Sequence, residues 1–193
     1  MGDIEIDREH FSREEIGKNP FFMPDREAAK RAARYVQACM EARDSCGGVV
    51  ECVITGVPAG LGEPCFDKLD ARLAGAVMSV GAVKGVEIGD GFAAAVAKGS
   101  TNNDVFVSRD GVIGKETNHA GGILGGISDS STVIVRAAVK PTPSIAARQR
   151  TVNKDGENIE ICIHGRHDPV IVPRAVVVIE AMAALTVADA LLD

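Results

Sequence analysis

The chain has 193 residues, 46% of them apolar and 25% charged, which is typical of one globular unit with a hydrophobic core. Its net charge of −6 excludes a general nucleic-acid surface, because phosphate binding needs an excess of Lys and Arg. The five cysteines are odd in number and include no C-x-x-C pair, so we expect reduced thiols and no metal site. The opening MGDIEIDREHF is acidic and polar and does not resemble a secretion leader, so the expected location is the cytoplasm.

The pattern of apolar residues and turn residues predicts helices mixed with β-hairpins. In chain order we expect a helix over about 26 to 43, a strand over 49 to 56, a helix over about 66 to 80, and strands at AVKGVEIG and STVIVRAAV. Hairpins are expected to turn at Asp110-Gly111 and at Asp155-Gly156. This mixture predicts an α+β fold with antiparallel sheets, formed as a single unit over residues 1 to 193.

The last segment, Val170 to Leu192, is almost wholly apolar and approaches the length of a membrane span. Arg174, Glu180 and Asp189 interrupt it, so we predict a buried helix and no membrane partner. A helix that is apolar on nearly every side belongs in a large core or in an oligomer interface. The chain is therefore not expected to stand alone.

The connection NHAGGILGGISDSS (118 to 131) has four glycines within six residues. Such a backbone can approach a ligand closely and can expose several N–H groups to an anion or a flat ring. It is not the dinucleotide fingerprint, because it lacks G-x-G-x-x-G and a strand follows it. The alternative is a tight turn that is packed for shape alone.

A second candidate is KPTPSI (140 to 145), in which two prolines pre-set a stiff extended backbone. Lys140, Thr142 and Ser144 alternate with apolar residues, so one side is expected to present an ammonium and two hydroxyls. Donors on a rigid backbone suit a phosphate group, since little conformational entropy is lost on binding. The alternative is an edge segment with solvated polar residues.

A third candidate is HGRHDP (164 to 169), where an apolar strand runs into a group of ionisable residues. Arg166 can supply a forked donor for an anion, and Asp168 beside fixed positive charge can stay ionised and take a proton. This interpretation predicts an acid–base centre beside an anion clamp. In the alternative, Arg166 and Asp168 form a structural ion pair and the two histidines are ordinary polar residues.

Taken together, five stretches resemble the successive signatures of the chorismate synthase family, in family order and spacing. They are NPFFMPD, GVPAGLGEPCFDKLDARLAGAVMSVGAVKGVEIGDGF, TNHAGGILGGIS, KPTPSI and GRHDPVIVPRAV. The resemblance implies a lyase of the shikimate pathway that converts 5-enolpyruvylshikimate-3-phosphate to chorismate by 1,4-anti elimination of phosphate. It also implies reduced FMN as cofactor, a homotetramer in the cytoplasm, and a β-α-β sandwich fold. Whether NADPH reduces the flavin on the enzyme or reduced FMN comes from elsewhere stays open.

The resemblance also assigns site residues. It implies that Asp168 lies near the flavin N5 and handles a proton, with no metal involved. The residues that it implies for the FMN site are Gly81, Ala82, Gly125, Lys140, Pro141, Thr142, Pro143, Ser144 and Arg166.

The family's N-terminal half is missing from this sequence. That half carries a Gly-x-Ser-His-Gly stretch, substrate-binding arginines and a second histidine motif, and His10 in DREHF matches neither histidine motif. The last residues, ADALLD, are expected to end in mid-helix. The chain thus resembles a C-terminal half, with part of the full fold and no complete catalytic machinery of its own. The alternative is a free-standing, non-catalytic module that binds a flavin or another anion.

Overall fold

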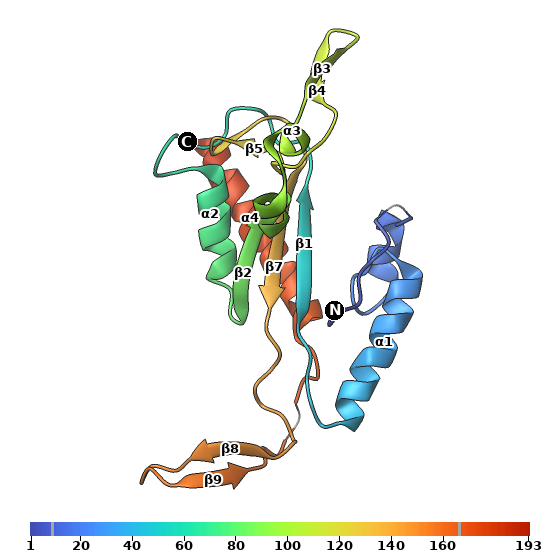
Figure 1. The fold of residues 1–193 in the computed structure, drawn as a ribbon, viewed down its shortest axis with the longest axis vertical. Helices are drawn as coiled ribbons and strands as arrows, with labels where there is room; N and C mark the ends of the chain where they lie inside the picture. Colours follow the sequence, from blue (N-terminus) through green and yellow to red (C-terminus); the bar gives the residue numbers. More distant parts are fainter. Residues whose placement is uncertain (9, 166) are drawn as a thin grey trace. The chain divides into compact units, whose positions relative to one another are not determined.

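A computed structural model describes residues 1–8, 10–165 and 167–193. Its helices are η1 (Arg13–Lys18), α1 (Arg26–Glu41), α2 (Leu69–Met78), η2 (Gly91–Val96), α3 (Gly99–Asn102) and α4 (Val172–Leu192) (Figure 1). Its strands are β1 (Gly48–Ile54), β2 (Val83–Ile88), β3 (Phe106–Arg109), β4 (Val112–Lys115), β5 (Ile123–Leu124), β6 (Ile127–Ser128), β7 (Val133–Val139), β8 (Gln149–Val152) and β9 (Asn158–Ile161). The predicted α+β class is confirmed.

The chain divides into two compact units. Unit 1 comprises Met1–Val49 and Val139–Val176, and unit 2 comprises Val50–Ala138 and Val177–Asp193. Each unit therefore combines two separate stretches of sequence. Compactness does not show whether either unit can fold without the other. The expectation of a single unit over residues 1 to 193 therefore stays a prediction.

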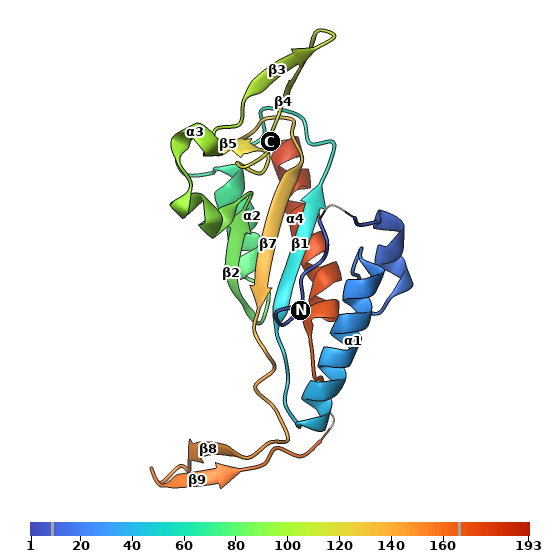
Figure 2. The ribbon, with the colours of Figure 1, turned by 45° about the vertical axis from the view of Figure 1, so that its right-hand side comes forward.

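Unit 2 is built on a sheet with the strand order β1-β7-β2. Figure 1 shows the arrows of β1 and β7 pointing in opposite directions, and Figures 1 and 2 place α2 and the later part of α4 on one face. The buried side chains alternate along β7 and recur every fourth residue along α2; they are Val133, Val135, Ala137, Leu69, Leu73 and Val77. Apolar residues with a period of 2 predicted the strand, and apolar residues with a period of about 3.6 predicted the helix. The same periods place these side chains in one core.

Helix α4 is where burial differs from the sequence-based expectation. One stripe is buried, formed in unit 2 by Ile179, Ala183, Thr186 and Ala190. Other apolar side chains of the helix are exposed, among them Val177, Val178, Leu185 and Leu191. A helix buried on all sides is therefore wrong for the described chain, because a single sheet covers only one side of it.

By length and composition, α4 is also apolar enough to cross a membrane. The core helices of soluble proteins meet the same two criteria, so this finding is weak evidence for a membrane segment. The alternative that α4 lies in an oligomer interface stays a prediction.

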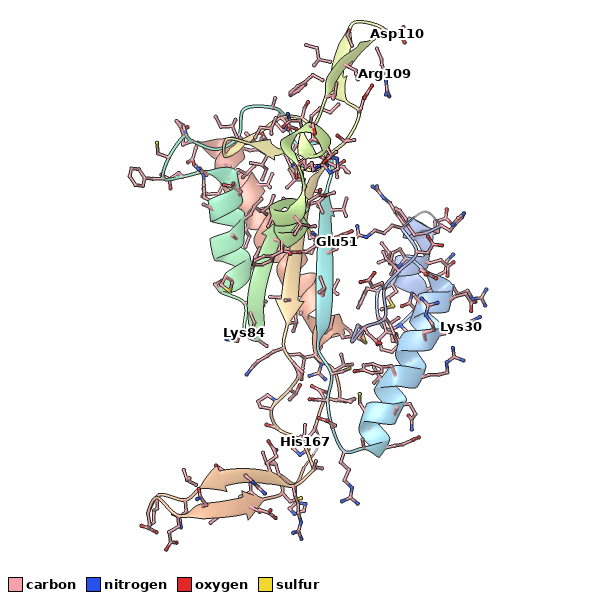
Figure 3. The ribbon with its side chains drawn as sticks, in the orientation of Figure 1. Lys30, Glu51, Lys84, Arg109, Asp110 and His167 are labelled. Atoms are coloured by element: carbon pink, nitrogen blue, oxygen red, sulfur yellow. The ribbon has the colours of Figure 1, made fainter. Side chains whose placement is uncertain are left out.

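Both predicted long hairpins are present. Strands β3 and β4 pair in an antiparallel register that sets Arg109 opposite Val112, so Asp110 and Gly111 form a two-residue turn. Both turn residues have positive φ, 54° and 79°, as a tight hairpin turn requires. Figure 3 labels Arg109 and Asp110 at the tip. The β8–β9 hairpin belongs to unit 1, and nearly all its side chains are exposed.

Helix α1 of unit 1 has an identifiable signal at each end. Asp25 caps its start by accepting hydrogen bonds from the N–H groups of Glu27 and Ala28. At its end, the Asp44 N–H donates to the Cys39 carbonyl (2.8 Å) and the Arg43 N–H to the Met40 carbonyl (3.0 Å). Arg43 is left-handed (φ 57°), so the chain turns back in a Schellman motif.

Candidate functional site

The KPTPSI segment follows β7 in unit 1, and its backbone carbonyls are held by side chains from elsewhere in that unit. The Ser45 hydroxyl donates to the Thr142 carbonyl at 2.7 Å. The Gln149 side-chain amide lies 3.4 Å from the carbonyl oxygens of both Pro143 and Ile145 and donates to each. These bonds fix the path of an already stiff backbone and leave the segment's own side chains for other contacts.

A glycine allows this segment to approach the start of β1. A Cβ atom added at Gly47 would lie 2.4 Å from the Val139 carbonyl oxygen and 3.1 Å from the Pro141 ring. The first distance is shorter than real Cβ contacts and the second is tight, so any other residue at position 47 would push the two backbones apart. The close contact keeps Pro141 against the connection between α1 and β1.

The polar side chains of KPTPSI differ in their surroundings. Lys140 is exposed and forms no ion pair with any residue that the structure describes, and Ser144 is half-buried. The Thr142 hydroxyl oxygen is buried and has no hydrogen-bond partner within the described ranges. Leaving a buried hydroxyl unpaired costs about 1–3 kcal/mol, so a polar partner for the Thr142 hydroxyl would be favourable. The common face expected for the three side chains stays a prediction.

Asp168 has a different partner from the one considered in the sequence analysis. Its carboxylate lies 2.7 Å from the guanidinium of Arg174, on the first turn of α4. Arg166 lies outside the described residues, so its predicted contacts stay predictions. Sequence analysis did not assign Arg174 a role in the site. The available signal was an arginine six positions after Asp168, in the first turn of the predicted helix.

The two histidines of HGRHDP differ in their contacts. His167, labelled in Figure 3, donates through Nε2 to the Ile163 carbonyl at 3.1 Å. His164 is exposed. The ring of His167 is thus tied to its own loop, which agrees with the alternative of ordinary polar histidines for this residue.

The connection between α1 and β1, residues 42–47, contacts both candidate segments of unit 1. Ser45 holds the Thr142 carbonyl, and the Arg43 carbonyl accepts from the Ala147 N–H at 3.1 Å. The Cys46 N–H donates to the Pro169 carbonyl at 2.9 Å, directly after Asp168. Two segments that are well separated in sequence are therefore joined to one short connection.

The remaining predicted residues, Gly81, Ala82 and Gly125, belong to unit 2. Gly125 is in the β5–β6 turn with φ 61°, and Ala82 has a positive φ of 71° although it is not glycine. A Cβ atom added at Gly81 or at Gly125 would meet no heavy atom within 4 Å. Both positions thus border open space.

The neighbouring glycines have a packing explanation. An added Cβ would lie 2.7 Å from the Thr132 carbonyl oxygen at Gly122 and 2.4 Å from the Lys68 side chain at Gly126. The Gly122 N–H is also satisfied, because it donates to the Asn118 side chain at 2.9 Å. The glycine run is thus partly a tight turn packed for shape, and Gly125 is the member that borders open space.

A buried group of charges supports this loop. Asp104 accepts hydrogen bonds from the Thr117 hydroxyl (2.7 Å) and from the backbone N–H groups of His119 (2.8 Å) and Ala120 (3.0 Å). Lys115, whose side chain is 3% exposed, forms ion pairs with Asp104 and Asp129. Burial alone would raise the pKa of Asp104, but these hydrogen bonds and Lys115 outweigh it and lower the pKa to about 2.

Sequence analysis also overlooked a histidine beside the glycine run. His119 Nδ1 lies 2.7 Å from the Asp90 carboxylate, and both side chains are partly exposed. A carboxylate at Nδ1 orients the ring and leaves Nε2 for another partner. The signal was a histidine two residues before the first glycine pair, but its aspartate comes from 29 residues away.

The fold class and one local feature of each unit can now be stated together. It is an α+β chain whose unit 1 holds a stiff polar segment with a buried hydroxyl that lacks a hydrogen-bond partner among the described residues, and whose unit 2 holds glycine turns that border open space. The sequence model of one family, described as chorismate synthase, matches residues 3–192.

Similar proteins agree with that match. The chain is 62% identical over 192 residues to the chorismate synthase of Agathobacter rectalis, which covers 100% of this chain and 52% of that protein. It is 56% identical over 189 residues to the chorismate synthase of Archaeoglobus fulgidus, covering 97% and 52%. A crystal structure of chorismate synthase matches with a TM-score of 0.76 at 35% identity, over 93% of this chain and 47% of that one.

The chain therefore belongs to the chorismate synthase family, and the predicted resemblance is confirmed. It spans about half the length of the curated relatives that it matches.

Proposed function

We propose that this chain supplies the flavin-side half of an FMN-dependent chorismate synthase. The complete enzyme would be a lyase that converts 5-enolpyruvylshikimate-3-phosphate to chorismate by 1,4-anti elimination of phosphate. Family membership supports the reaction class. The observation in this chain that carries the proposal is the buried hydroxyl of Thr142, which has no hydrogen-bond partner among the described residues and belongs to the same segment as the exposed Lys140.

The residues present fit a flavin nucleotide. Lys140 carries a positive charge without an ion-pair partner among the described residues, and the Thr142 hydroxyl needs a polar partner. In the proposal these two groups, with Pro141, Pro143 and Ser144, contact FMN. The proposal also assigns FMN contacts to Gly81, Ala82, Gly125 and Arg166. Reduced FMN, when bound, would lend an electron that helps phosphate to leave and would regain it afterwards.

Asp168 is the proposed proton-handling group. Its carboxylate is paired with Arg174, which fixes its orientation. With 32% of its side chain exposed, it is also accessible to a reacting group. An oriented carboxylate can accept and return a proton during the elimination, and Arg174 acts as its positioning residue.

The assembly and location follow from the same proposal. The partner molecule is the small, anionic substrate, and neither nucleic acid nor membrane is involved. The exposed apolar side chains of α4 support association with further protein, and we propose a homotetramer for the complete enzyme, located in the cytoplasm. The proposal includes a source of reduced flavin, which is either an intrinsic NADPH-dependent reduction or reduced FMN supplied from elsewhere.

The test is a chimera that restores the missing half. Residues 3–192 replace the matching region of the Agathobacter rectalis relative, and the purified protein is incubated without oxygen with reduced FMN and 5-enolpyruvylshikimate-3-phosphate. We expect phosphate release and chorismate formation that both require reduced FMN. The isolated 193-residue chain should bind FMN weakly and form no chorismate, because acid–base groups supply about 10²- to 10⁴-fold each.

Two outcomes decide between the candidates. A folded chimera that binds FMN and releases no phosphate would leave only the alternative of a non-catalytic flavin- or anion-binding module. A chimera that folds and binds no FMN, while the parent relative does, would remove this chain's residues from the flavin site.

A further inference from the structure

A buried ion-pair cluster in unit 2 joins the two ends of the glycine loop, residues 118–131. The ammonium of Lys115 lies 3.4 Å from the Asp104 carboxylate and 2.5 Å from the Asp129 carboxylate. All three side chains are at most 10% exposed. Two buried carboxylates would repel each other, so the single ammonium is what allows both to lie here.

Each carboxylate residue is attached to a different end of the loop. Asp104 accepts hydrogen bonds from the backbone N–H groups of His119 and Ala120, which precede the first glycine pair. Asp129 follows the second glycine pair, and its own N–H donates back to the Gly122 carbonyl at 3.1 Å. One ammonium therefore connects the start of the glycine run to its end.

The middle of the loop forms an exposed tip between these two attachments. Strands β5 and β6 have only two residues each, and the turn between them contains Gly125. Leu124 and Gly125 are exposed, whereas Ile123 and Gly126 on either side are buried. Such a short hairpin does not set its own position. The position of the tip therefore depends on where the two ends of the loop are held.

Lys115 acts on this tip through the loop and not through direct contact with a ligand. It is the last residue of β4, and its ammonium lies 5.9 Å from the ring centre of Phe106, its partner on β3. Figures 1 and 2 show the β3–β4 hairpin projecting from the end of unit 2 where β5 also lies. With 3% of its side chain exposed, Lys115 is too buried to meet a ligand itself.

Stability alone does not account for the cluster. Removing charges from water costs free energy, and well-packed apolar residues of similar volume are often as stable or more stable. Apolar residues would not provide a directional link between two backbone segments, because hydrogen bonds and ion pairs constrain direction as well as distance. The specific effect of the cluster is therefore on the geometry of the loop.

We propose that Lys115 is a positioning residue for the flavin: with Asp104 and Asp129 it fixes both ends of the glycine loop and so places Gly125 for contact with FMN. The inference rests on the proposed function, in which Gly125 contacts the cofactor. It adds that a buried lysine outside the contact residues controls FMN affinity through the order of the loop.

The experiment compares FMN affinity and loop order in the chimera described above, in which this chain is part of a full-length protein. The test variant is Lys115→Met, Asp129→Asn, which removes one charge of each sign and leaves Asp104 with its three hydrogen-bond donors. Asp129→Asn alone is the milder variant, and it decides the test if circular dichroism shows that the double variant is unfolded. Ile179→Ala is the matched control, because it removes buried volume from the unit 2 core outside the loop.

We expect the dissociation constant for FMN, measured by quenching of flavin fluorescence, to rise ~10-fold in the double variant and ~3-fold in Asp129→Asn, because binding must then order the loop. Without FMN, the backbone amides of residues 119–126 should exchange with solvent ~10-fold faster or more in the double variant, as followed by mass spectrometry. The Ile179→Ala control should lose stability and keep its FMN affinity within about 2-fold of the wild type.

Three outcomes would overturn this inference and leave the proposed function intact. They are equal FMN affinity in the wild type and the folded variants, unchanged exchange of the loop amides, and an equal loss of affinity in Ile179→Ala, which would point to a general loss of stability. A folded wild-type chimera that binds no FMN would instead overturn the proposed function, and this inference with it.

Discussion

The carboxylate of Asp168 and the guanidinium of Arg174 form an ion pair of 2.7 Å at the start of α4. Asp168 precedes the helix and Arg174 lies in its first turn, so the helix start sets the geometry of the pair. The finding gives Asp168 a fixed cationic neighbour whatever Arg166 contacts. It also allows the role of the carboxylate to be separated from that of its partner.

The first expectation concerns Asp168 as a base. In the chimera, Asp168→Asn keeps the size and removes the carboxylate, so phosphate release should fall by about 10²-fold or more while FMN still binds. Arg174→Gln, which changes only the positioning, should cause a smaller loss. Asp155→Asn, in the exposed β8–β9 turn, is the matched control, and turnover near normal in Asp168→Asn would remove this residue from the mechanism.

The second expectation concerns the unpaired hydroxyl. Thr142→Val replaces the buried hydroxyl with a methyl group of similar volume, so the free energy of unfolding without FMN should rise by about 1 kcal/mol or stay unchanged. FMN affinity, followed by quenching of flavin fluorescence, should fall in the same variant. Thr151→Val, on an exposed face of β8, should change neither quantity. Loss of stability with unchanged FMN binding would contradict the assignment of Thr142 to the cofactor.

The third expectation concerns acid stability. The pKa of Asp104 in the folded chain is about 2, below its ordinary value of 3.8. Its ionised form therefore contributes stability that is present above about pH 4 and is lost as pH falls toward 2, on the order of 2 kcal/mol in all. Urea unfolding across this range should show a steeper loss in the wild type than in Asp104→Asn. Parallel curves would show that Asp104 does not link folding to pH, and exposed Asp110→Asn is the control.

The fourth expectation separates two glycines of one loop. Gly125→Ala places a methyl group in open space at φ 61°, which should cost about 1–2 kcal/mol for the left-handed conformation. Gly122→Ala has a comparable φ of 80° and also brings its Cβ to 2.7 Å from the Thr132 carbonyl oxygen, so it should be clearly less stable. Thermal unfolding of both variants measures the difference. Equal losses would show that packing does not distinguish the two positions.

The fifth expectation concerns the exposed side of α4. The isolated chain should self-associate or bind an apolar dye, because Val178 and Leu185 are 44% and 64% exposed on one helix. The double variant Val178→Lys, Leu185→Lys should reduce the associated fraction in light scattering. Val112→Lys, Ile113→Lys adds the same charge on the exposed β3–β4 hairpin and should not. A wild-type chain that is monomeric and binds no dye would contradict this expectation.

Much of the local structure could be predicted because its causes are local. Asp110-Gly111 forms the turn that its residue types require, Asp25 caps the helix that follows it, and the alternation along β7 places its valines in the core. The family, too, was evident from the order and spacing of short signatures.

The tertiary structure decided which side chains meet, because those contacts join residues that are distant in sequence. Ser45 reaches the Thr142 carbonyl across 97 positions, and nothing in either local sequence indicates the other. The same reason explains why the pairing of His119 with Asp90 was missed. Burial of α4 also depends on what covers it: its composition specified an apolar helix, and only packing showed that one stripe of it is covered in this chain.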